Sequence, residues 1–406
     1  MTLKSRYRSL RFLAAAAFAA VTMGCQEKLN APADCPAFCP ANTVIFDTIL
    51  APLPGSDSSF TGYVLRGQGA SLRVSDQLPA SEDRAIVRFT SRGDSVLVSD
   101  TLRSYVLDSV AFNLTILARD SSVKGLTVFL YRIPIALADS VATFPAVDNL
   151  LVPANLIDSA IVSDTLAGGF VRMVLGGADT VRASIPAADS GQLAYAIRIH
   201  ANAPTGVRFG GAASGSTTGP VFTTFVTANI ADTALRHQVF TELAAFNTFV
   251  SQSSPVLSPD LLAVGGSPSS RTLLRFAIPA QFKDSAQFLK ATLELTPSAP
   301  IIGLPSDTAI LQARAVLSDF GKKSPTASNQ ISNFPLIEGS ADTVRVEVLN
   351  LVKAWQGPNA LPSELMISME PEGSGFTLVQ FGSTRSATPA PRLRLTYALS
   401  FPFQRP

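Results

Sequence analysis

The sequence predicts an all-β protein with two tandem antiparallel β-sandwich domains. Three observations lead to this prediction. Apolar residues make up 47% of the 406 residues, and they come in short runs that Ser, Thr, Asp, Gly and Pro interrupt. Several runs alternate apolar with polar residues, as half-buried strands do. The order of these runs in the first half of the chain recurs in the second half, so each half would bury its apolar residues between two stacked sheets.

The first 24 residues have the pattern of a secretory signal. Basic residues at positions 4, 6, 8 and 11 lead into an apolar run of about a dozen residues, which ends near the small residue Gly24. The run is shorter than the roughly 20 apolar residues that cross a membrane as a helix. The segment therefore predicts export from the cytoplasm.

The residues at the end of this signal, Val21-Thr22-Met23-Gly24-Cys25, resemble the lipobox of bacterial lipoproteins. The resemblance implies that Cys25 is lipid-modified and becomes the mature N-terminus, which would tether the protein to the cell envelope. Residue 26 is Gln rather than Asp, which by the same resemblance implies the outer membrane, on either its periplasmic or its outer face. The alternative is an ordinary cleaved signal that ends near a cysteine.

Residues 25–42 predict a linker tether, since they are polar and rich in Pro and Ala. Cys35 and Cys39 lie in this segment and are the other cysteines of the sequence. Outside the cytoplasm such a pair is expected to form a small disulfide. Reduced thiols are the next alternative, and two thiols without a nearby His make a poor zinc site.

Strand-like runs dominate the predicted first domain, residues 43–229. They are rich in Val, Ile, Phe, Thr and Leu and comprise residues 43–49, 85–89, 110–117, 126–133, 195–199 and 221–227. In one of them Val110, Phe112 and Leu114 alternate with other residues, which places these three on one sheet face toward a core. Helical signals are few, and residues 234–249 and 348–355 each suit a helix or a strand.

Asp followed by Ser or Thr recurs along the chain and indicates turns and strand entries. Examples are Asp57-Ser58, Asp108-Ser109, Asp179-Thr180 and Asp307-Thr308. These side chains can bond to the backbone two residues on. Calcium binding is the alternative use of repeated Asp, but these aspartates are scattered singly and no DxDxDG spacing occurs, so turn chemistry is favoured.

An internal repeat defines the predicted domains. Its matched segments are 63–64 with 249–250, 72–74 with 262–264, 84–89 with 271–276, 110–114 with 291–295, 194–199 with 364–369, 207–210 with 379–382 and 220–225 with 391–396. Each match is short, but their shared order makes the repeat much stronger than any one of them. The period is far longer than that of a solenoid repeat. The sequence therefore predicts two whole domains, residues 43–229 and residues 230–406.

The composition argues against nucleic-acid binding. The net charge is +2, acids and bases are interspersed, and charged residues are 15% of the chain against roughly 25% in a typical soluble protein. No long basic stretch is present that would neutralise a phosphate backbone.

The sequence also lacks the common motifs of enzymes. His200 and His237 lie in no metal-binding spacing, and no Gly-x-Ser-x-Gly, P-loop or dinucleotide motif occurs. A pair of carboxylates can hydrolyse a glycosidic bond, and Glu364, Glu370 and Glu372 lie close together in the sequence. They flank a predicted strand, however, and are expected to face water. We therefore expect no catalytic site, no bound metal and no cofactor.

Several segments of the predicted second domain carry a family resemblance. They are Leu262-Ala263-Val264-Gly265, residues 271–279 (RTLLRFAIP), residues 291–295 (ATLEL), Trp355 with Gly357 after residues 346–354, and residues 391–397 (PRLRLTY). They resemble the DNRLRE-type β-sandwich domain of bacterial secreted and surface proteins, which is grouped with carbohydrate-binding modules, over most of residues 245–398. Ala277 replaces the usual acid, and no Asn-Tyr-Gly segment follows the tryptophan. The resemblance implies a jelly-roll-like fold and, in some relatives, binding of a polysaccharide such as alginate.

Trp355, Arg271 and Arg275 are the candidate ligand-binding residues. A tryptophan ring can stack on a sugar, but a lone tryptophan of a β-sandwich is more often part of the core. Arg271 and Arg275 lie four residues apart on one strand and hence on one face. They could meet an acidic polysaccharide or pair with Asp or Glu across the sheet, and pairing is favoured.

The leading functional prediction is a non-catalytic, lipid-anchored envelope protein that displays two β-sandwich domains for adhesion or surface structure. Its partners would be the membrane, through the lipid, and polysaccharide or other envelope proteins. The alternative is a surface module that binds an alginate-like polysaccharide. A polysaccharide-degrading enzyme is a third hypothesis.

Overall fold

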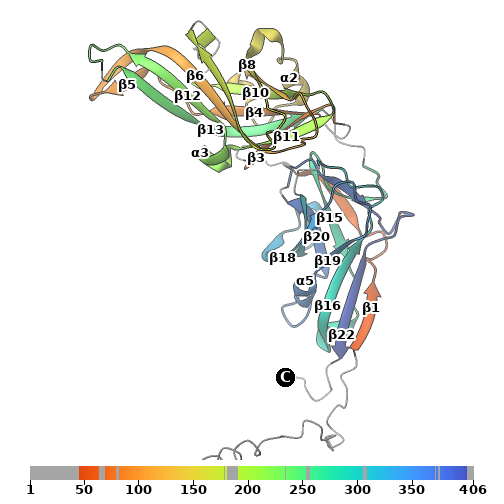
Figure 1. Ribbon diagram of the computed structural model, residues 1–406. Helices are drawn as coiled ribbons and strands as arrows, with labels where there is room; N and C mark the ends of the chain where they lie inside the picture. The colour runs from red at the N-terminus through yellow and green to blue at the C-terminus, as the bar shows by residue number, and fades with distance from the viewer. Residues whose placement is uncertain are drawn as a thin grey trace, which may run out of the picture. The chain divides into compact units, whose positions relative to one another are not determined.

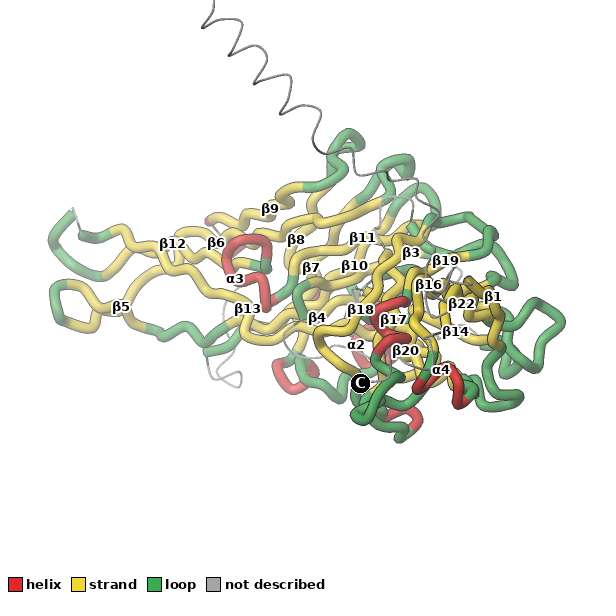
Figure 2. Tube along the Cα trace, turned by 90° about the horizontal axis from the view of Figure 1, so that it is seen from below, coloured by secondary structure: helices red, strands yellow, loops and turns green. Residues whose placement is uncertain are grey.

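The computed structural model describes residues 45–63, 69–78, 82–177, 179–180, 191–233, 235–252, 257–304, 309–370, 372–373 and 375–399. Strands predominate in this part of the chain, with short helices between them (Figure 2). The strand pairs whose register is described are antiparallel. The predicted all-β class is therefore confirmed. The signal, the tether, Cys25, Cys35 and Cys39 lie outside the described residues.

Two sheets pack against each other around residues of the second half. The four-stranded sheet has the order β1 (Ile45–Leu50), β22 (Arg392–Leu399), β16 (Ala286–Leu295), β19 (Val344–Glu347). The seven-stranded sheet has the order β18 (Thr326–Leu336), β17 (Ala309–Val316), β20 (Glu364–Glu370), β15 (Ser269–Arg275), β14 (Leu262–Gly265), β21 (Leu378–Phe381), and β2 (Ser58–Tyr63) pairs with β15. Buried side chains of both sheets, such as Leu293 and Leu274, belong to one core. These two sheets form a β-sandwich, called the second sandwich below.

An eleven-stranded sheet forms the first sandwich (Figure 1). Its main path is β3 (Ser71–Asp76), β11 (Thr205–Gly210), β6 (Thr101–Arg119), β12 (Val221–Ala228), β13 (His237–Ser251), β4 (Asp83–Phe89), β10 (Ala194–His200), β7 (Thr127–Ile133), β8 (Leu156–Ile161), and both β5 (Ser95–Val98) and β9 (Gly169–Gly176) pair with β6. Buried residues from both ends of this path, such as Leu72 and Val128, belong to one core. The sheet therefore closes over itself around that core.

The described helices have three to five residues each and connect strands. They are η1 (Ile135–Leu137), α2 (Phe144–Asp148), η2 (Pro153–Asn155), η5 (Ala212–Ser214), α3 (Gly215–Thr218), α4 (Ala280–Asp284), η6 (Gly321–Lys323) and α5 (Leu349–Lys353). The two segments that suited either a helix or a strand have different outcomes: β13 is a strand, and α5 is a helix. Strands β1, β4, β6, β7, β10 and β12 cover the described residues of the six runs predicted for the first half, except that β7 begins one residue after the start of its run.

The two sandwiches have the same strand order, as the sequence repeat predicts. The order β13-β12-β6-β9 of the first sandwich corresponds to β1-β22-β16-β19 of the second. The order β8-β7-β10-β4-β13 corresponds to β18-β17-β20-β15-β2, and β3-β11 corresponds to β14-β21. Each matched sequence segment from 72–74 onward lies in or beside a corresponding strand.

The ends of the repeat are connected in a way that the sequence does not reveal. The first half of β13 pairs with β12 and its second half pairs with β4, so this single strand does in the first sandwich what β1 and β2 do in the second. Strands β1 and β2 precede the first sandwich in the chain but belong to the sheets of the second. The predicted boundaries, 43–229 and 230–406, assign β1 and β2 to the first domain and β13 to the second, although β1 and β2 belong to the second sandwich and β13 to the first. The division into two domains remains a prediction.

Candidate functional site

The outer face of the seven-stranded sheet carries a row of polar side chains. Alternate residues of β15, β17 and β20 point away from the core, since successive strand residues face opposite sides. The strand register places Gln312 opposite Ser368 and Arg314 opposite Met366. Arg271 and Arg275 share this face on β15, with Arg275 opposite Glu364. The face therefore brings together residues from three strands that are distant in sequence.

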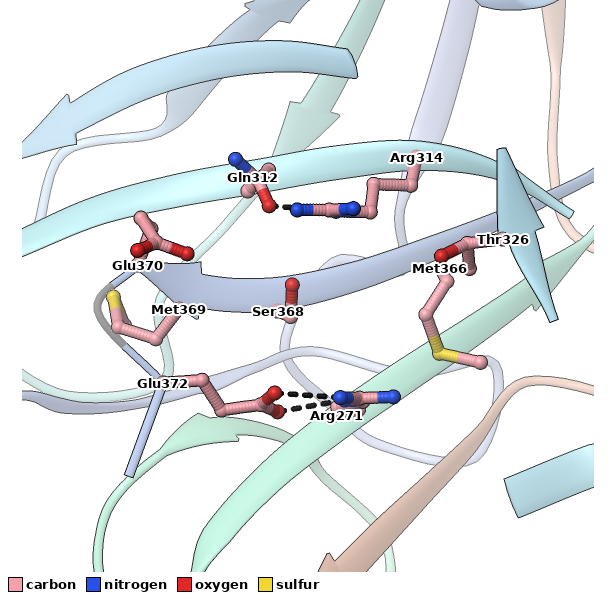
Figure 3. A pocket seen from close by; sticks show the side chains of 9 residues that line it. All are labelled: Arg271, Gln312, Arg314, Thr326, Met366, Ser368, Met369, Glu370 and Glu372. Atoms are coloured by element: carbon pink, nitrogen blue, oxygen red, sulfur yellow. Dashed lines mark hydrogen bonds and ion pairs between the residues drawn. The ribbon is translucent and has the colours of Figure 1, made fainter. Parts of the chain in front are cut away.

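A pocket of about 140 Å³ lies on this face (Figure 3). Its lining is Arg271, Gln312, Arg314, Thr326, Met366, Ser368, Met369, Glu370 and Glu372. Two guanidinium groups and two carboxylates thus surround a small space in which hydroxyl, amide and thioether groups complete the walls. The lining contains no aromatic ring.

Arg271 and Glu372 form one wall of the pocket as a two-point ion pair. Arg271 Nε lies 2.6 Å from Glu372 Oε1, and Nη2 lies 2.5 Å from Oε2. The two side chains are 28% and 20% exposed. This geometry matches the planar fork of the guanidinium to the carboxylate, so the pair holds the segment after β20 against β15.

Arg314 and Gln312 form the opposite wall. Arg314 Nε donates to Gln312 Oε1 at 2.6 Å (Figure 3). Gln312 Nε2 in turn donates to Asn333 Oδ1 at 3.0 Å. Gln312 thereby fixes the base of the Arg314 guanidinium. The terminal nitrogens of Arg314 have no partner among the described residues, and they remain available to a ligand in the pocket.

Residues 317–325, which join β17 to β18, are held against this face by an ion pair between Asp319 and Arg275. Arg275 Nε and Nη2 lie 2.7 and 2.9 Å from the two carboxylate oxygens of Asp319. Asp319 also accepts the backbone N–H of Gly321 at 2.9 Å. Beneath this segment Leu273, Val316 and Met366 form a small buried cluster. The segment therefore covers one end of the face and leaves the pocket at the other.

The charges in this group shift two pKa values in opposite directions. The hydrogen bonds from Arg275 and from the Gly321 backbone hold the pKa of Asp319 well below its usual range. Burial, and then the negative charge of Asp319, raise the pKa of Glu364 from 4.5 to about 7. Glu364 Oε2 is buried without a hydrogen-bond partner among the described residues, which agrees with a carboxyl group that retains its proton near neutral pH.

The structure places the three candidate ligand-binding residues differently. Arg271 and Arg275 share one face, and both are engaged in ion pairs across the sheet, as the favoured alternative stated. Trp355 is 1% exposed and packs 5.9 Å from the Phe276 ring in the core. The ligand-binding hypothesis for Trp355 is therefore corrected, because a ring without accessible surface cannot stack on a sugar.

The residues flanking β20 differ from the expectation that all three would face water. Glu370 is exposed, but Glu372 is paired with Arg271 and the side chain of Glu364 is 13% exposed beside Arg275. The sequence does not identify Arg314 and Gln312 as candidate site residues. Their spacing of two residues within a strand-like run signals one shared sheet face, but nothing in the sequence shows that this face meets Arg271.

The histidines lie elsewhere. His200 Nδ1 is 3.0 Å from Asp76 Oδ2, and His237 Nδ1 is 3.9 Å from Asp108 Oδ2. The described residues contain no group of three or more His, Cys, Asp or Glu side chains that could hold a metal ion. No helix in the described part of the chain is long and apolar enough to cross a membrane.

Neither a protein-family model nor a curated protein matches this sequence. The DNRLRE-type and lipoprotein resemblances therefore remain predictions. Among solved structures, the chain is similar to the tandem CBM51 modules of a family 98 glycoside hydrolase from Streptococcus pneumoniae SP3-BS71. The identity is 10%, the match covers 85% of this chain and 100% of that chain, and the TM-score is 0.12. A TM-score this low does not show a shared fold.

Proposed function

We propose that the protein is a non-catalytic protein of the bacterial cell envelope that binds an acidic polysaccharide through the pocket on its seven-stranded sheet. The observation that carries the proposal is the Arg314 guanidinium, which Gln312 orients and whose terminal nitrogens face the pocket without a partner among the described residues. A guanidinium binds carboxylates by two parallel hydrogen bonds. Ser368 and Thr326 supply hydroxyl groups that can bond to sugar hydroxyls.

The lining favours an acidic polymer over a neutral one. Neutral sugars usually bind by stacking on aromatic rings, and the pocket residues are polar or thioether side chains instead. The resemblance of residues 245–398 to domains whose relatives bind alginate supports the same class of ligand. The attachment to the membrane through lipidated Cys25, in the outer membrane, is part of this proposal and rests on the lipobox-like segment.

Non-catalytic action is proposed because Glu370 is the one carboxylate of the described lining without an ion-pair partner, and a glycosidase ordinarily needs two carboxyl groups. Glu372 is neutralised by Arg271, and Asp319 is held by Arg275. Glu364 has a raised pKa of about 7 but is not among the residues that line the pocket. A polysaccharide-degrading activity would appear as new reducing ends or unsaturated products when the protein is incubated with alginate.

Binding of alginate to the chain from residue 26 onward, measured by isothermal titration at low ionic strength, tests the proposal. Arg314→Gln is expected to weaken binding about tenfold or more, since a hydrogen bond to a charged group contributes roughly 1.5–3 kcal/mol. Arg394→Gln removes the same charge from a half-exposed position of the other sheet and is expected to leave binding unchanged. Equal losses in both variants, or no binding by the unmodified chain, would contradict a specific site.

The attachment needs a separate test. Palmitate labelling of the mature protein in cells is expected, and Cys25→Ser is expected to abolish it. Label that persists in the variant would place the lipid elsewhere.

Adhesion or surface structure is the second candidate function. A different observation favours it: the outer sheet face that β9, β6, β12 and β13 form in the first sandwich carries few charged residues and several exposed apolar ones.

A further inference from the structure

The first sandwich has an outer sheet face that is nearly free of charge. It is formed by β9, β6, β12 and β13, which lie in this order in the sheet, and Figure 1 shows β6, β12 and β13 side by side. The register aligns its residues in rows across the strands: Arg172, Asn113, Val221 and Leu243, then Val174, Ala111, Thr223 and Thr241, then Gly176, Ser109, Phe225 and Val239. Phe170 lies at one end of these rows, beside Thr115. We call this set of residues the apolar face.

The large side chains of the apolar face are open to solvent. Phe170 is 71% exposed, Val239 is 58% exposed and Val174 is 53% exposed. Leu243 is also exposed, while Val221 and Phe225 are half-buried. Single exposed apolar residues are ordinary, but several of them on one sheet face, with small and hydroxyl side chains between them, are typical of an interaction site.

The second sandwich provides an internal comparison. Its corresponding face, on β19, β16, β22 and β1, carries Glu347, Thr292 and Arg394 in one row and Arg345, Glu294 and Arg392 in the next. Arg345 and Arg394 each lie 3.6 Å from Glu294. In these two rows the second sandwich thus carries five charged side chains on β19, β16 and β22, whereas the matching rows on β9, β6 and β12 of the first sandwich carry Arg172 alone. The strand order therefore does not demand an apolar face at this position.

Charges at the two ends of the apolar face are complementary to each other. Arg172, at one end, has no partner among the described residues. Asp108 lies on β6 at the other end, where it accepts the Thr227 hydroxyl at 2.7 Å and lies 3.9 Å from His237. Arg172 and Asp108 lie on the neighbouring strands β9 and β6, and the Val174 row and the Phe225 row lie between them.

We propose that the apolar face is the contact surface between two copies of this chain, packed sheet on sheet about a two-fold axis that crosses the strands between the Thr223 and Phe225 rows. This axis reverses the order of the rows, so Arg172 of each copy meets the Asp108 end of the other. The apolar side chains of the two faces interdigitate, as in the interior of a sandwich where sheets lie about 10 Å apart. A two-fold contact of this kind uses one surface patch twice and closes after two copies.

The oligomeric state of the chain from residue 26 onward, which retains every described strand, tests this proposal. Sedimentation velocity and light scattering over a wide concentration range are expected to show a monomer–dimer equilibrium. Arg172→Asp and Asp108→Arg are each expected to raise the dissociation constant about tenfold or more, because each places like charges opposite one another. The double variant is expected to recover most of the lost affinity, since it restores opposite charges.

Two controls make the result specific. Arg394→Asp reverses a charge on the corresponding face of the second sandwich and is expected to leave the dissociation constant unchanged. Val239→Lys is expected to abolish the dimer. The variant is expected to unfold at the same temperature as the unmodified chain does when that chain is monomeric. A chain that remains monomeric at every concentration, a dimer that Val239→Lys does not weaken, or a double variant no tighter than the single ones would overturn the proposal. Binding of the apolar face to lipid vesicles by a monomeric chain would overturn it as well.

Discussion

Arg275, Asp319 and Glu364 show how three neighbouring charges can have unequal roles. Arg275 makes its best contacts to Asp319, at 2.7 and 2.9 Å, and reaches Glu364 at 3.8 Å. Asp319 is therefore the stabilised carboxylate. Glu364 has less access to water and faces a fixed negative charge, which explains why the pKa of one carboxyl group falls and that of the other rises.

The raised pKa of Glu364 predicts a pH dependence of stability. The folded chain holds a proton on Glu364 up to about pH 7, whereas the unfolded chain releases it near pH 4.5. The unfolding free energy therefore falls as pH rises through this window. Glu364→Gln, which cannot ionise, is expected to lose less stability than the unmodified chain between pH 5 and pH 7.5, as measured by chemical denaturation. Parallel pH profiles of the two chains would refute the assignment.

Asp319 should act in the opposite sense. Folding lowers the pKa of Asp319. The ionised carboxylate therefore adds to the unfolding free energy at pH values above the ordinary pKa of Asp, and this stabilisation is lost as the pH falls below that value. Asp319→Asn is expected to cost stability at pH 7 but not at very acidic pH, which provides the matched control for the Glu364 variant.

Strand β1 illustrates how an element that looks peripheral in sequence completes a sheet. It lies at the edge of the four-stranded sheet beside β22. The Phe46 ring stacks on the Tyr397 ring at 5.5 Å, and Asp47 accepts the Thr396 hydroxyl at 2.6 Å. Without β1, the backbone donors and acceptors on that edge of β22 would be unpaired, and unpaired edges recruit other chains.

A chain that begins at residue 51 is accordingly expected to be less stable and more prone to aggregation than one that begins at residue 43. The difference should be visible as a lower thermal midpoint and as light scattering on heating. Since the sheet loses only one edge strand, the pocket on the opposite sheet is expected to retain its ligand. Identical melting of the two chains would show that β1 contributes little.

At the scale of the whole molecule, the placement of β1, β2 and β13 links the two halves of the chain. The strands of the second sandwich come from both sides of the first sandwich in sequence. The stability of the second sandwich should therefore depend on residues that the repeat assigns to the first half.

Fragments test this arrangement. Residues 43–229 lack β13, and residues 230–406 lack β1 and β2, so neither fragment contains a full set of strands for one sandwich. Both are expected to show broad or absent unfolding transitions. Residues 69–252 contain β3 to β13 and are expected to unfold cooperatively. A cooperative transition in 230–406 that matches the full chain would mean that β1 and β2 are dispensable.

The sequence was sufficient for the fold class and for the repeat. A period of two depends on residues that are neighbours in the chain, so Val110, Phe112 and Leu114 identify their own strand and its buried face. The sequence was insufficient to decide between helix and strand for residues 234–249, because an apolar run of that kind suits both until its neighbours in the fold are known. Strands β12 and β4, which lie on either side of β13, decide the matter.

The candidate site depends on tertiary structure for a related reason. Strand patterning places Arg271 and Arg275 on one face, and Gln312 and Arg314 on one face, but each pattern is local to its strand. Pairing of β20 with both β15 and β17 puts these faces on the same side of one sheet, and the segment after β20 adds Glu372. Local alternation therefore accounts for the strands and their buried faces in this protein. Contacts between distant residues determine which strands are neighbours, which arginines share the pocket, and which sandwich contains β1 and β2.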